Sequence, residues 1–270
     1  MAFAEKAHYG IGDLVEIVRL LRQPDGCPWD REQTHASIRK SLIEETYEVA
    51  DAIDRQDDTL LCEELGDLLL QVVMHAQMAG EVDSFNFEDV CDGICQKLIY
   101  RHPHVFGEME SGLSSGRVLA NWEKLKNSEK GRNTAADRLD SVPTSLPALM
   151  YAQKVQKRAA DYQFCYEDVA GAMADLDSEI SELKAAVAGD GPKGHDAADE
   201  IGDVLFSAVN VARFLGADAE EALTASSRKF TARLKRAEAL AAENGETLND
   251  QDDAGRDALW RQAKAEEEGG

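Results

Sequence analysis

The sequence lacks any long apolar run. None of its uninterrupted apolar stretches approaches the roughly 20 residues that a membrane-spanning helix needs. Its first residues, MAFAEKAHYG, also lack the basic segment followed by an apolar run that marks a secretory signal. We therefore expect a cytoplasmic protein with no membrane partner.

Basic side chains are scarce as well. The 270 residues include 29 Lys and Arg against 52 Asp and Glu, so the formal net charge is -23. Nonspecific binding to nucleic acid depends on a basic surface, and this balance argues against a nucleic-acid partner. A polyanionic substrate could still bind through a metal ion and a few placed cations.

Paired cysteines and strand patterns are missing too. The five cysteines are an odd number and form no CxxC pair, so the sequence indicates neither a disulfide framework nor a zinc ribbon. Cys91 and Cys95, one helical turn apart, are expected to be half-buried core thiols. No segment alternates apolar and polar residues convincingly, whereas apolar residues recur at three- and four-residue steps, so we predict an all-α fold.

What the sequence has in abundance is carboxylates, and one stretch from residue 41 to residue 80 arranges them. Glu45 and Glu48 stand one turn apart on one predicted helix, and Glu64 and Asp67 stand one turn apart on the next. A short polar break joins the two helices, so they must run antiparallel as neighbours. We expect the four carboxylates to converge.

Converging carboxylates repel one another and need a cation to neutralise them. An all-oxygen donor set without histidine or cysteine suits a hard divalent ion, so Mg²⁺ or Mn²⁺ is favoured over Zn²⁺. The alternative is that an acidic chain simply carries glutamates on solvated helix faces. Recurrence of the pattern elsewhere in the chain argues against that alternative.

The second copy contains Glu179 and Glu182, then Glu200 and Asp203, each pair at a spacing of three. ELGDLLL from residue 64 resembles EIGDVLF from residue 200. Basic pairs follow both copies in the same order, Lys97 and Arg101 after the first and Lys229 and Arg233 after the second. The repeat predicts two similar helical bundle domains at 1–130 and 148–270, joined by a linker at 131–147.

The remaining pattern predicts further helices and loops. Asp30 and Gln33 have capping-box spacing, so a helix should start at Arg31 and lead into the acidic stretch. Trp29 could stack on a base or plug the end of the bundle. Pro103 should end a helix, which disfavours a metal site at HPH. Other predicted helices are 11–21, 87–100, 118–130, 148–162, 168–188, 196–215, 219–244 and 252–268, with loops at 111–116 and 189–194.

A four-carboxylate site with basic residues on a neighbouring helix suits metal-assisted attack on a phosphate ester or anhydride. The loop GDGPKG at 189–194 is not a Walker loop, because His195 follows the second glycine where Lys and then Ser or Thr are needed, and helices flank both sides. No Ser/His/Asp or Cys/His arrangement suggests a competing chemistry.

Five motifs carry a resemblance to a known family. They are GCPWDREQT at 26–34, EETYEVA at 44–50, ELGDLL at 64–69, RHPHVF at 101–106 and SLPAL at 145–149. Together they resemble the MazG nucleoside triphosphate pyrophosphohydrolases in their tandem two-domain form, over nearly the whole chain. The resemblance implies a homodimer of helical domains, dependence on Mg²⁺, and hydrolysis of NTPs or dNTPs to monophosphate and pyrophosphate with broad base tolerance.

The resemblance also implies residue roles. Glu45, Glu48, Glu64 and Asp67 would bind metal in the first domain, and Glu179, Glu182, Glu200 and Asp203 would do so in the second. Glu45, Glu48, Glu179 and Glu182 are the predicted catalytic carboxylates. The predicted substrate-binding residues are Lys97, Arg101, Lys229, Arg233 and Trp260.

One position departs from the family pattern. The first domain keeps the adjacent pair Glu44 and Glu45, whereas the second has Ser178 before Glu179. Adjacent helix residues point about 100° apart, so the first member of the pair should position water and not bind metal directly. Three alternatives stay open: a narrower pyrophosphohydrolase, a nucleotide- or protein-binding regulator without turnover, and a structural helical bundle.

Overall fold

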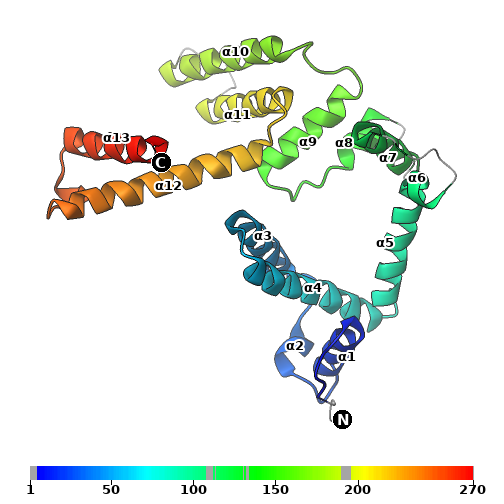
Figure 1. Ribbon diagram of the computed structural model, residues 1–270. Helices are drawn as coiled ribbons and strands as arrows, with labels where there is room; N and C mark the ends of the chain where they lie inside the picture. Colours follow the sequence, from blue (N-terminus) through cyan, green and yellow to red (C-terminus); the bar gives the residue numbers. More distant parts are fainter. Residues whose placement is uncertain are drawn as a thin grey trace. The chain divides into compact units, whose positions relative to one another are not determined.

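The computed structural model describes residues 5–107, 112, 114–129, 131, 134–189 and 196–269. All regular elements in these ranges are helices, which confirms the all-α prediction (Figure 1). The chain separates into two compact units, Met1–Lys126 and Asn127–Gly270. Among the described helices, none is long and apolar enough to cross a membrane.

Unit 1 is built around one long helix, α4, against which both α1 and α3 pack. The core between α1 and α4 consists of Val18, Ile38, Val73, Met74 and Met78. The helices of unit 1 are α1 (Ile11–Leu21), α2 (Pro28–Glu32), α3 (Arg39–Arg55), α4 (Asp58–Gly80), α5 (Phe87–Arg101), α6 (Pro103–Phe106) and α7 (Ser115–Glu129).

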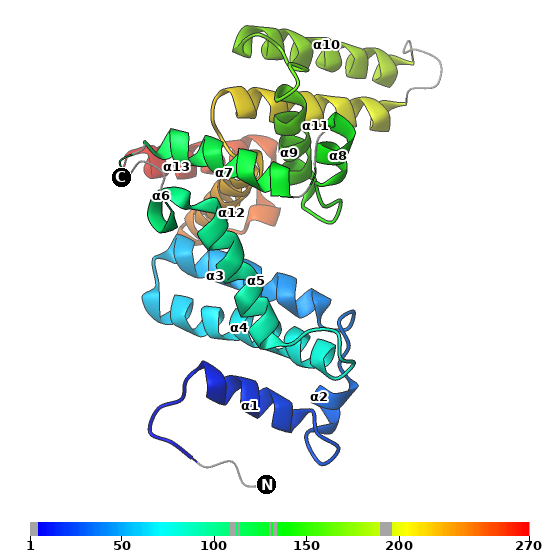
Figure 2. The same cartoon turned by 90° about the vertical axis from the view of Figure 1, so that its right-hand side faces the viewer.

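Unit 2 repeats this packing, because α9 and α10 both pack against α11. Beyond α11 the chain forms a hairpin in which α13 folds back along α12, with a core of Ala237, Leu240, Ala241, Leu259 and Ala263. Figure 2 shows α10 and α11 side by side. The elements of unit 2 are α8 (Ala135–Asp140), α9 (Ala148–Ala160), α10 (Val169–Ala188), α11 (Ala197–Phe214), α12 (Ala219–Glu243), the 3-10 helix η1 (Leu248–Asp250) and α13 (Asp253–Gly269).

The turns before the second helix of each acidic pair are fixed locally. Gln56 adopts a left-handed conformation with φ 55° and ends α3, and the Asp57 carboxylate then accepts hydrogen bonds from the amides of Thr59 and Leu60 to start α4. Asp196 caps α11 in the same way. Such caps satisfy amides that the first turn of a helix leaves without partners, so α3 and α4 are joined by only two residues and lie as neighbours.

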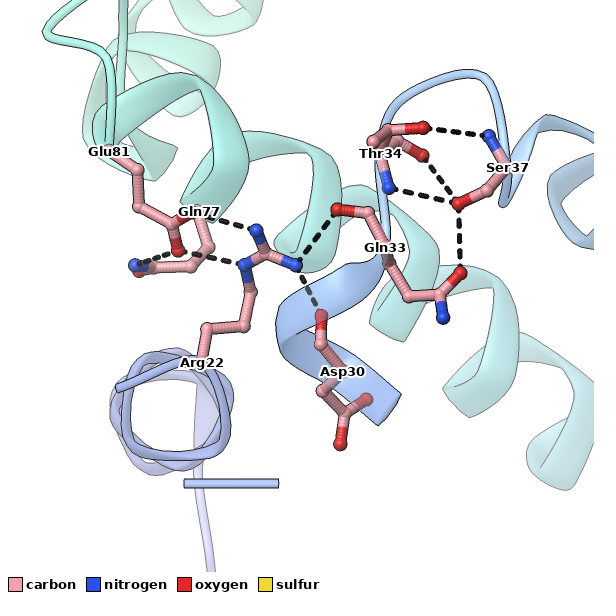
Figure 3. A network of polar contacts seen from close by, with 7 residues as sticks. All are labelled: Arg22, Asp30, Gln33, Thr34, Ser37, Gln77 and Glu81. Atoms are coloured by element: carbon pink, nitrogen blue, oxygen red, sulfur yellow. Dashed lines mark hydrogen bonds and ion pairs between the residues drawn. The ribbon is translucent and has the colours of Figure 1, made fainter. Parts of the chain in front are cut away.

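The predicted helix start at Arg31 is wrong. Helix α2 begins at Pro28 and ends at Glu32, and α3 starts only at Arg39. Proline suits the first turn of a helix, because its fixed φ is already helical and its missing N–H needs no partner there. The break after α2 is held by Arg22, whose guanidinium donates to the backbone carbonyls of Asp30 and Gln33 (Figure 3).

Arg22 is the hub of this network. Its side chain is only 6 % exposed, and its Nε and Nη2 atoms each lie 2.7 Å from a carboxylate oxygen of Glu81 at the end of α4. Gln77 donates to the same carboxylate at 3.0 Å. The ion pair therefore ties the segment after α1 to α4, across 59 positions of sequence.

Two burial predictions fail. Trp29 is 64 % exposed, so it does not plug the bundle within this chain. Cys91 and Cys95 on α5 are exposed and not half-buried. The interval 131–147, predicted as a linker, includes the short helix α8, which packs against α9.

Two predicted loops fall largely outside the described residues. In the segment 111–116, only residues 112 and 114–116 are described, and α7 already begins at Ser115. In the segment 189–194, Gly189 ends α10 in a left-handed conformation with φ 81°, and residues 190–195 lie outside the described ranges.

Candidate metal centres

Unit 1 brings three of its four predicted metal ligands together. Glu45 and Glu48 on α3 and Glu64 on α4 each offer a carboxylate oxygen, and these oxygens lie within 4.8 Å of one another. Asp67 is outside this group but close enough to Glu45 to raise its pKa. We call these four residues the unit 1 cluster.

The unit 1 cluster is electrostatically unfavourable without a cation. The pKa of Glu45 is raised, first by burial and then by the negative charges of Asp67 and Glu48. The pKa of Glu64 is raised by burial and then by Glu48. Both shifts show that the fold crowds like charges that a positive ion could neutralise.

Unit 2 repeats the arrangement. Glu179 and Glu182 on α10 and Glu200 on α11 offer oxygens that lie within 4.8 Å of one another. Glu200 is only 1 % exposed, and burial followed by the charges of Glu182 and Asp203 raises the pKa of Glu179. Glu179, Glu182, Glu200 and Asp203 form the unit 2 cluster. The donors of both clusters are all carboxylate oxygens, which fits a hard divalent cation.

The two clusters differ at the departing position. In unit 1 the Glu44 carboxylate lies 2.8 Å from Lys40 on the exposed side of α3. In unit 2 the Ser178 hydroxyl instead donates to Glu182 Oε1 at 3.3 Å. A neutral side chain thus contacts a cluster carboxylate in unit 2, where unit 1 has an acid turned to a lysine.

The predicted substrate-binding residues of unit 1 are partly covered. Arg101 is buried, and its guanidinium lies 5.3 Å from the centre of the Trp122 ring on α7. Lys126 approaches the same ring at 4.8 Å. Lys97, one turn before Arg101 on α5, is exposed.

In unit 2 the predicted substrate-binding residues lie on the α12–α13 hairpin. Arg233 forms an ion pair with Glu267 of α13, while Lys229, one turn earlier, is exposed. Trp260 packs against Phe230, with ring centres 5.2 Å apart. Helix α13 therefore covers part of the face of α12 that carries these residues.

A cavity of about 530 Å³ lies beside the unit 2 cluster and was missed by sequence reasoning. At its edge, Asp175 accepts a hydrogen bond of 2.6 Å from Ser207 Oγ. Asp175 also accepts from the Tyr166 hydroxyl, which is the main cause that raises the pKa of Tyr166 to about 12. Asp175 precedes Glu179 by one helical turn, a spacing that could have signalled its place beside the cluster.

Comparison with known proteins agrees with this geometry. The family model for the MazG nucleotide pyrophosphohydrolase domain matches residues 33–106, which include the unit 1 cluster. The chain is 42 % identical over 256 residues to a Thermotoga maritima protein named nucleoside triphosphate pyrophosphohydrolase/pyrophosphatase MazG, covering 95 % of this chain and 96 % of the relative.

Two further relatives extend the comparison. The nucleoside triphosphate pyrophosphohydrolase of Escherichia coli K12 is 43 % identical over 258 residues, which are 95 % of this chain and 98 % of that protein. An uncharacterised Bacillus subtilis protein, YabN, is 44 % identical over 251 residues, which are 93 % of this chain and 51 % of YabN. Because the first two relatives match over nearly the whole length of both sequences, the chain belongs to the MazG nucleotide pyrophosphohydrolase family.

Proposed function

We propose that the chain hydrolyses nucleoside triphosphates, both NTPs and dNTPs, at the α,β-phosphoanhydride and releases a nucleoside monophosphate and pyrophosphate. The observation that carries this proposal is the pair of clusters, each with three glutamates whose oxygens lie within 4.8 Å of one another. The names of the Thermotoga and Escherichia relatives support the reaction type. A broad base tolerance would suit removal of unwanted nucleotides from a cytoplasmic pool.

We assign the metal to the cluster residues, with Mg²⁺ as the favoured ion and Mn²⁺ as the alternative. When bound, such an ion supplies Lewis acidity and lowers the pKa of bound water. Glu45, Glu64 and Glu179 have raised pKa values, and of these Glu45 and Glu179 occupy matching positions in the two units, so we assign them to accept a proton from the attacking water. Glu48 and Glu182 complete the catalytic set.

Cations of this chain would offset charge on the leaving pyrophosphate. Lys97 and Lys229 are exposed, so their ammonium groups are accessible to an anion from solvent. Arg101 stacks on Trp122, and Arg233 pairs with Glu267, so each must give up or share its present contact. Trp260, on the same hairpin as Arg233, is proposed to lie near the nucleotide.

We propose that 1–130 and 148–270 are tandem MazG-like domains joined by 131–147. The support is a shared packing pattern: α1 and α3 lie on α4 as α9 and α10 lie on α11. The two copies also correspond outside the clusters. When their sequences are aligned so that Glu64 matches Glu200, Val73 matches Val209, and both valines are buried.

A homodimer is also proposed. Leu65 on α4 and Ile201 on α11, at 48 % and 44 % exposure, precede Gly66 and Gly202 at matching places of the two units. A Cβ at either glycine would meet nothing within 4 Å among the described residues. Glycine inside a helix costs about 1 kcal/mol of stability relative to alanine. Close packing of a helix from a second copy against these glycines would offset that cost.

Product analysis with ATP and dGTP plus Mg²⁺ tests the reaction. Pyrophosphate and monophosphate should appear, and Glu48→Gln and Glu182→Gln should each disable the unit that carries it. Asp51→Asn is the matched control on α3, because this carboxylate pairs with Arg55. If the wild type releases no pyrophosphate from any common triphosphate, the hydrolase proposal fails and the binding-regulator alternative takes its place.

A further inference from the structure

Two histidines of unit 1 meet edge to edge, away from the unit 1 cluster. His35 lies between α2 and α3, and His75 lies on α4. Their Nδ1 atoms are 2.7 Å apart, their ring centres are 5.0 Å apart, and their ring planes are parallel within 1°. Rings stacked face to face could not bring two nitrogens so close without overlapping, so the two rings lie nearly in one plane with both nitrogens between the centres. This is the geometry of an N–H···N hydrogen bond between two imidazoles.

A preformed turn positions His35. The amide of Ser37 donates to Thr34 Oγ1 at 3.1 Å, and the amide of Thr34 donates to Ser37 Oγ at 2.9 Å (Figure 3). The next residue, Ile38, donates its amide to the Thr34 carbonyl at 3.3 Å and buries its side chain in the core of unit 1. We call residues 34–38 the entry turn, because they lead directly into α3. The His35–His75 bond therefore ties the start of α3 to α4.

The second nitrogen of His75 makes a positive charge on this ring costly. Its Nε2 atom is buried and has no hydrogen-bond partner among the described residues. A charged His75 would carry an N–H at this atom without an acceptor, and burying such a group costs more than burying the neutral ring. His35 is exposed, so water can solvate its Nε2. The pair should therefore take its first added proton on His35.

The charges around His75 leave His35 as its one charged neighbour. Helices α1, α3 and α5 pack against α4. Their charged groups, and those of α4, include the pairs Glu16 with Arg19, Lys40 with Glu44 and Arg22 with Glu81, and Asp89, which accepts from the Asn86 amide. Burial and then the charge of His35 lower the pKa of His75, and no other charged group of the described residues contributes.

We propose that the His35–His75 pair is an acid-released clamp that holds the entry turn on α4. In the neutral pair, His35 donates its Nδ1–H to His75 Nδ1. A first added proton goes to the exposed Nε2 of His35, and the hydrogen bond is kept and becomes charge-assisted. A second proton must go to His75 Nδ1, so that two N–H groups and two positive charges face each other and the bond breaks.

The direction of the pH effect identifies the clamp. Because the pKa of His75 is lowered in the folded state, its stabilising contribution is complete above the ordinary value of 6.5 and is lost as pH falls through the lowered value. The raised pKa values of Glu45 and Glu64 act in the opposite direction in metal-free protein, so these carboxylates cannot cause a loss in acid. In unit 2 the position matched to His75 is Val211, so the clamp belongs to unit 1 alone.

NMR of the ring nitrogens, on protein labelled with ¹⁵N at its six histidines, tests the proposal without a variant. His75 should titrate below 6.5 and after His35. Over the same pH range, amide hydrogen exchange in the entry turn, corrected for its intrinsic pH dependence, should become about fivefold faster, as the loss of one hydrogen bond predicts.

His35→Ala removes the clamp at an exposed position. Exchange in the entry turn should then be about fivefold faster than in the wild type at about pH 8, and should change by less than about twofold on going to about pH 5. The pKa of His75 should rise toward 6.5, because the neighbouring charge is gone. His102→Ala is the matched control, because His102 Nδ1 also forms a 2.7 Å hydrogen bond, but to the Leu98 carbonyl, which does not titrate. This control should behave as the wild type at the entry turn.

Two results would overturn the clamp. One is exchange in the wild-type entry turn that is equal at both pH values, and the other is His35→Ala loosening in acid as much as the wild type does. A His75 that titrates at or above 6.5 in the wild type would contradict it as well. None of these measurements uses a nucleotide, so the clamp and the proposed hydrolysis stand or fail separately.

Discussion

Addition of Mg²⁺ should raise the melting temperature of the protein, and the size of the effect should grow with pH. The pKa values of Glu45, Glu64 and Glu179 are raised in the folded, metal-free state. The folded state therefore holds these protons more tightly than the unfolded state, so their stabilising contribution is complete below the ordinary glutamate pKa and is lost as pH rises through the raised values. At neutral pH the metal-free folded protein therefore lacks the stabilising contribution of these bound protons.

The expected magnitude follows from linkage. A ligand that binds only the folded state at 100 times its Kd adds about 2.7 kcal/mol of stability. For units of about 130 residues, this corresponds to a rise of roughly 10 °C in Tm. At about pH 4.5, near the ordinary glutamate pKa, the carboxylates with raised pKa values are more than half protonated, so competition from the protons should shrink the rise markedly.

Differential scanning calorimetry with and without Mg²⁺ measures this effect, with NaCl at matched ionic strength as the control for screening. Glu48→Gln should remove the stabilisation of unit 1 only, and Glu182→Gln that of unit 2 only. Asp51→Asn should leave both intact. An undiminished rise in the Glu48→Gln, Glu182→Gln double variant would refute the reasoning, because the ion would then bind elsewhere.

Three further outcomes are expected. Arg22→Ala should cost about 2–3 kcal/mol in urea unfolding, because it leaves the partly buried Glu81 carboxylate without its cation; a loss below about 0.5 kcal/mol would contradict the network in Figure 3. In ultraviolet titration, Asp175→Asn should lower the pKa of the Tyr166 phenol from about 12 toward its ordinary value. A raised pKa stabilises the folded state until the pH rises through it, so the wild type should lose this contribution only in strong alkali. Leu65→Asp should convert a dimer to monomer in light scattering; an unchanged mass would show that this face of α4 is not the interface.

Local periodicity made most of the fold predictable. The helix at 11–21 was predicted with the bounds that the structure has, and the predicted helix at 87–100 ends one residue short of the observed α5. Both have apolar residues at helical spacing and clear stop signals after them. The carboxylate clusters were predictable for the same reason, since helices joined by a short break place residues one turn apart on facing sides.

What failed depends on contacts that are distant in sequence. The end of α2 is set by Arg22, which is in turn held by Glu81, and no local pattern reports that pair. Exposure of Trp29 and Cys91 depends on which helices cover a face and not on the face alone. The cavity could not be predicted because Gln156 and Phe206 meet across 50 positions of sequence.

Comparison of the units shows how a tandem repeat can divide its work. Both keep the same helix packing and three converging glutamates, so selection for metal binding alone would not distinguish them. Among the described residues, unit 2 has a cavity of about 530 Å³ with Asn210 in its wall, whereas the matching residue of unit 1, Met74, is buried in its core. We therefore expect Glu182→Gln to lower pyrophosphate release by more than Glu48→Gln does, and equal losses from the two variants would contradict this division.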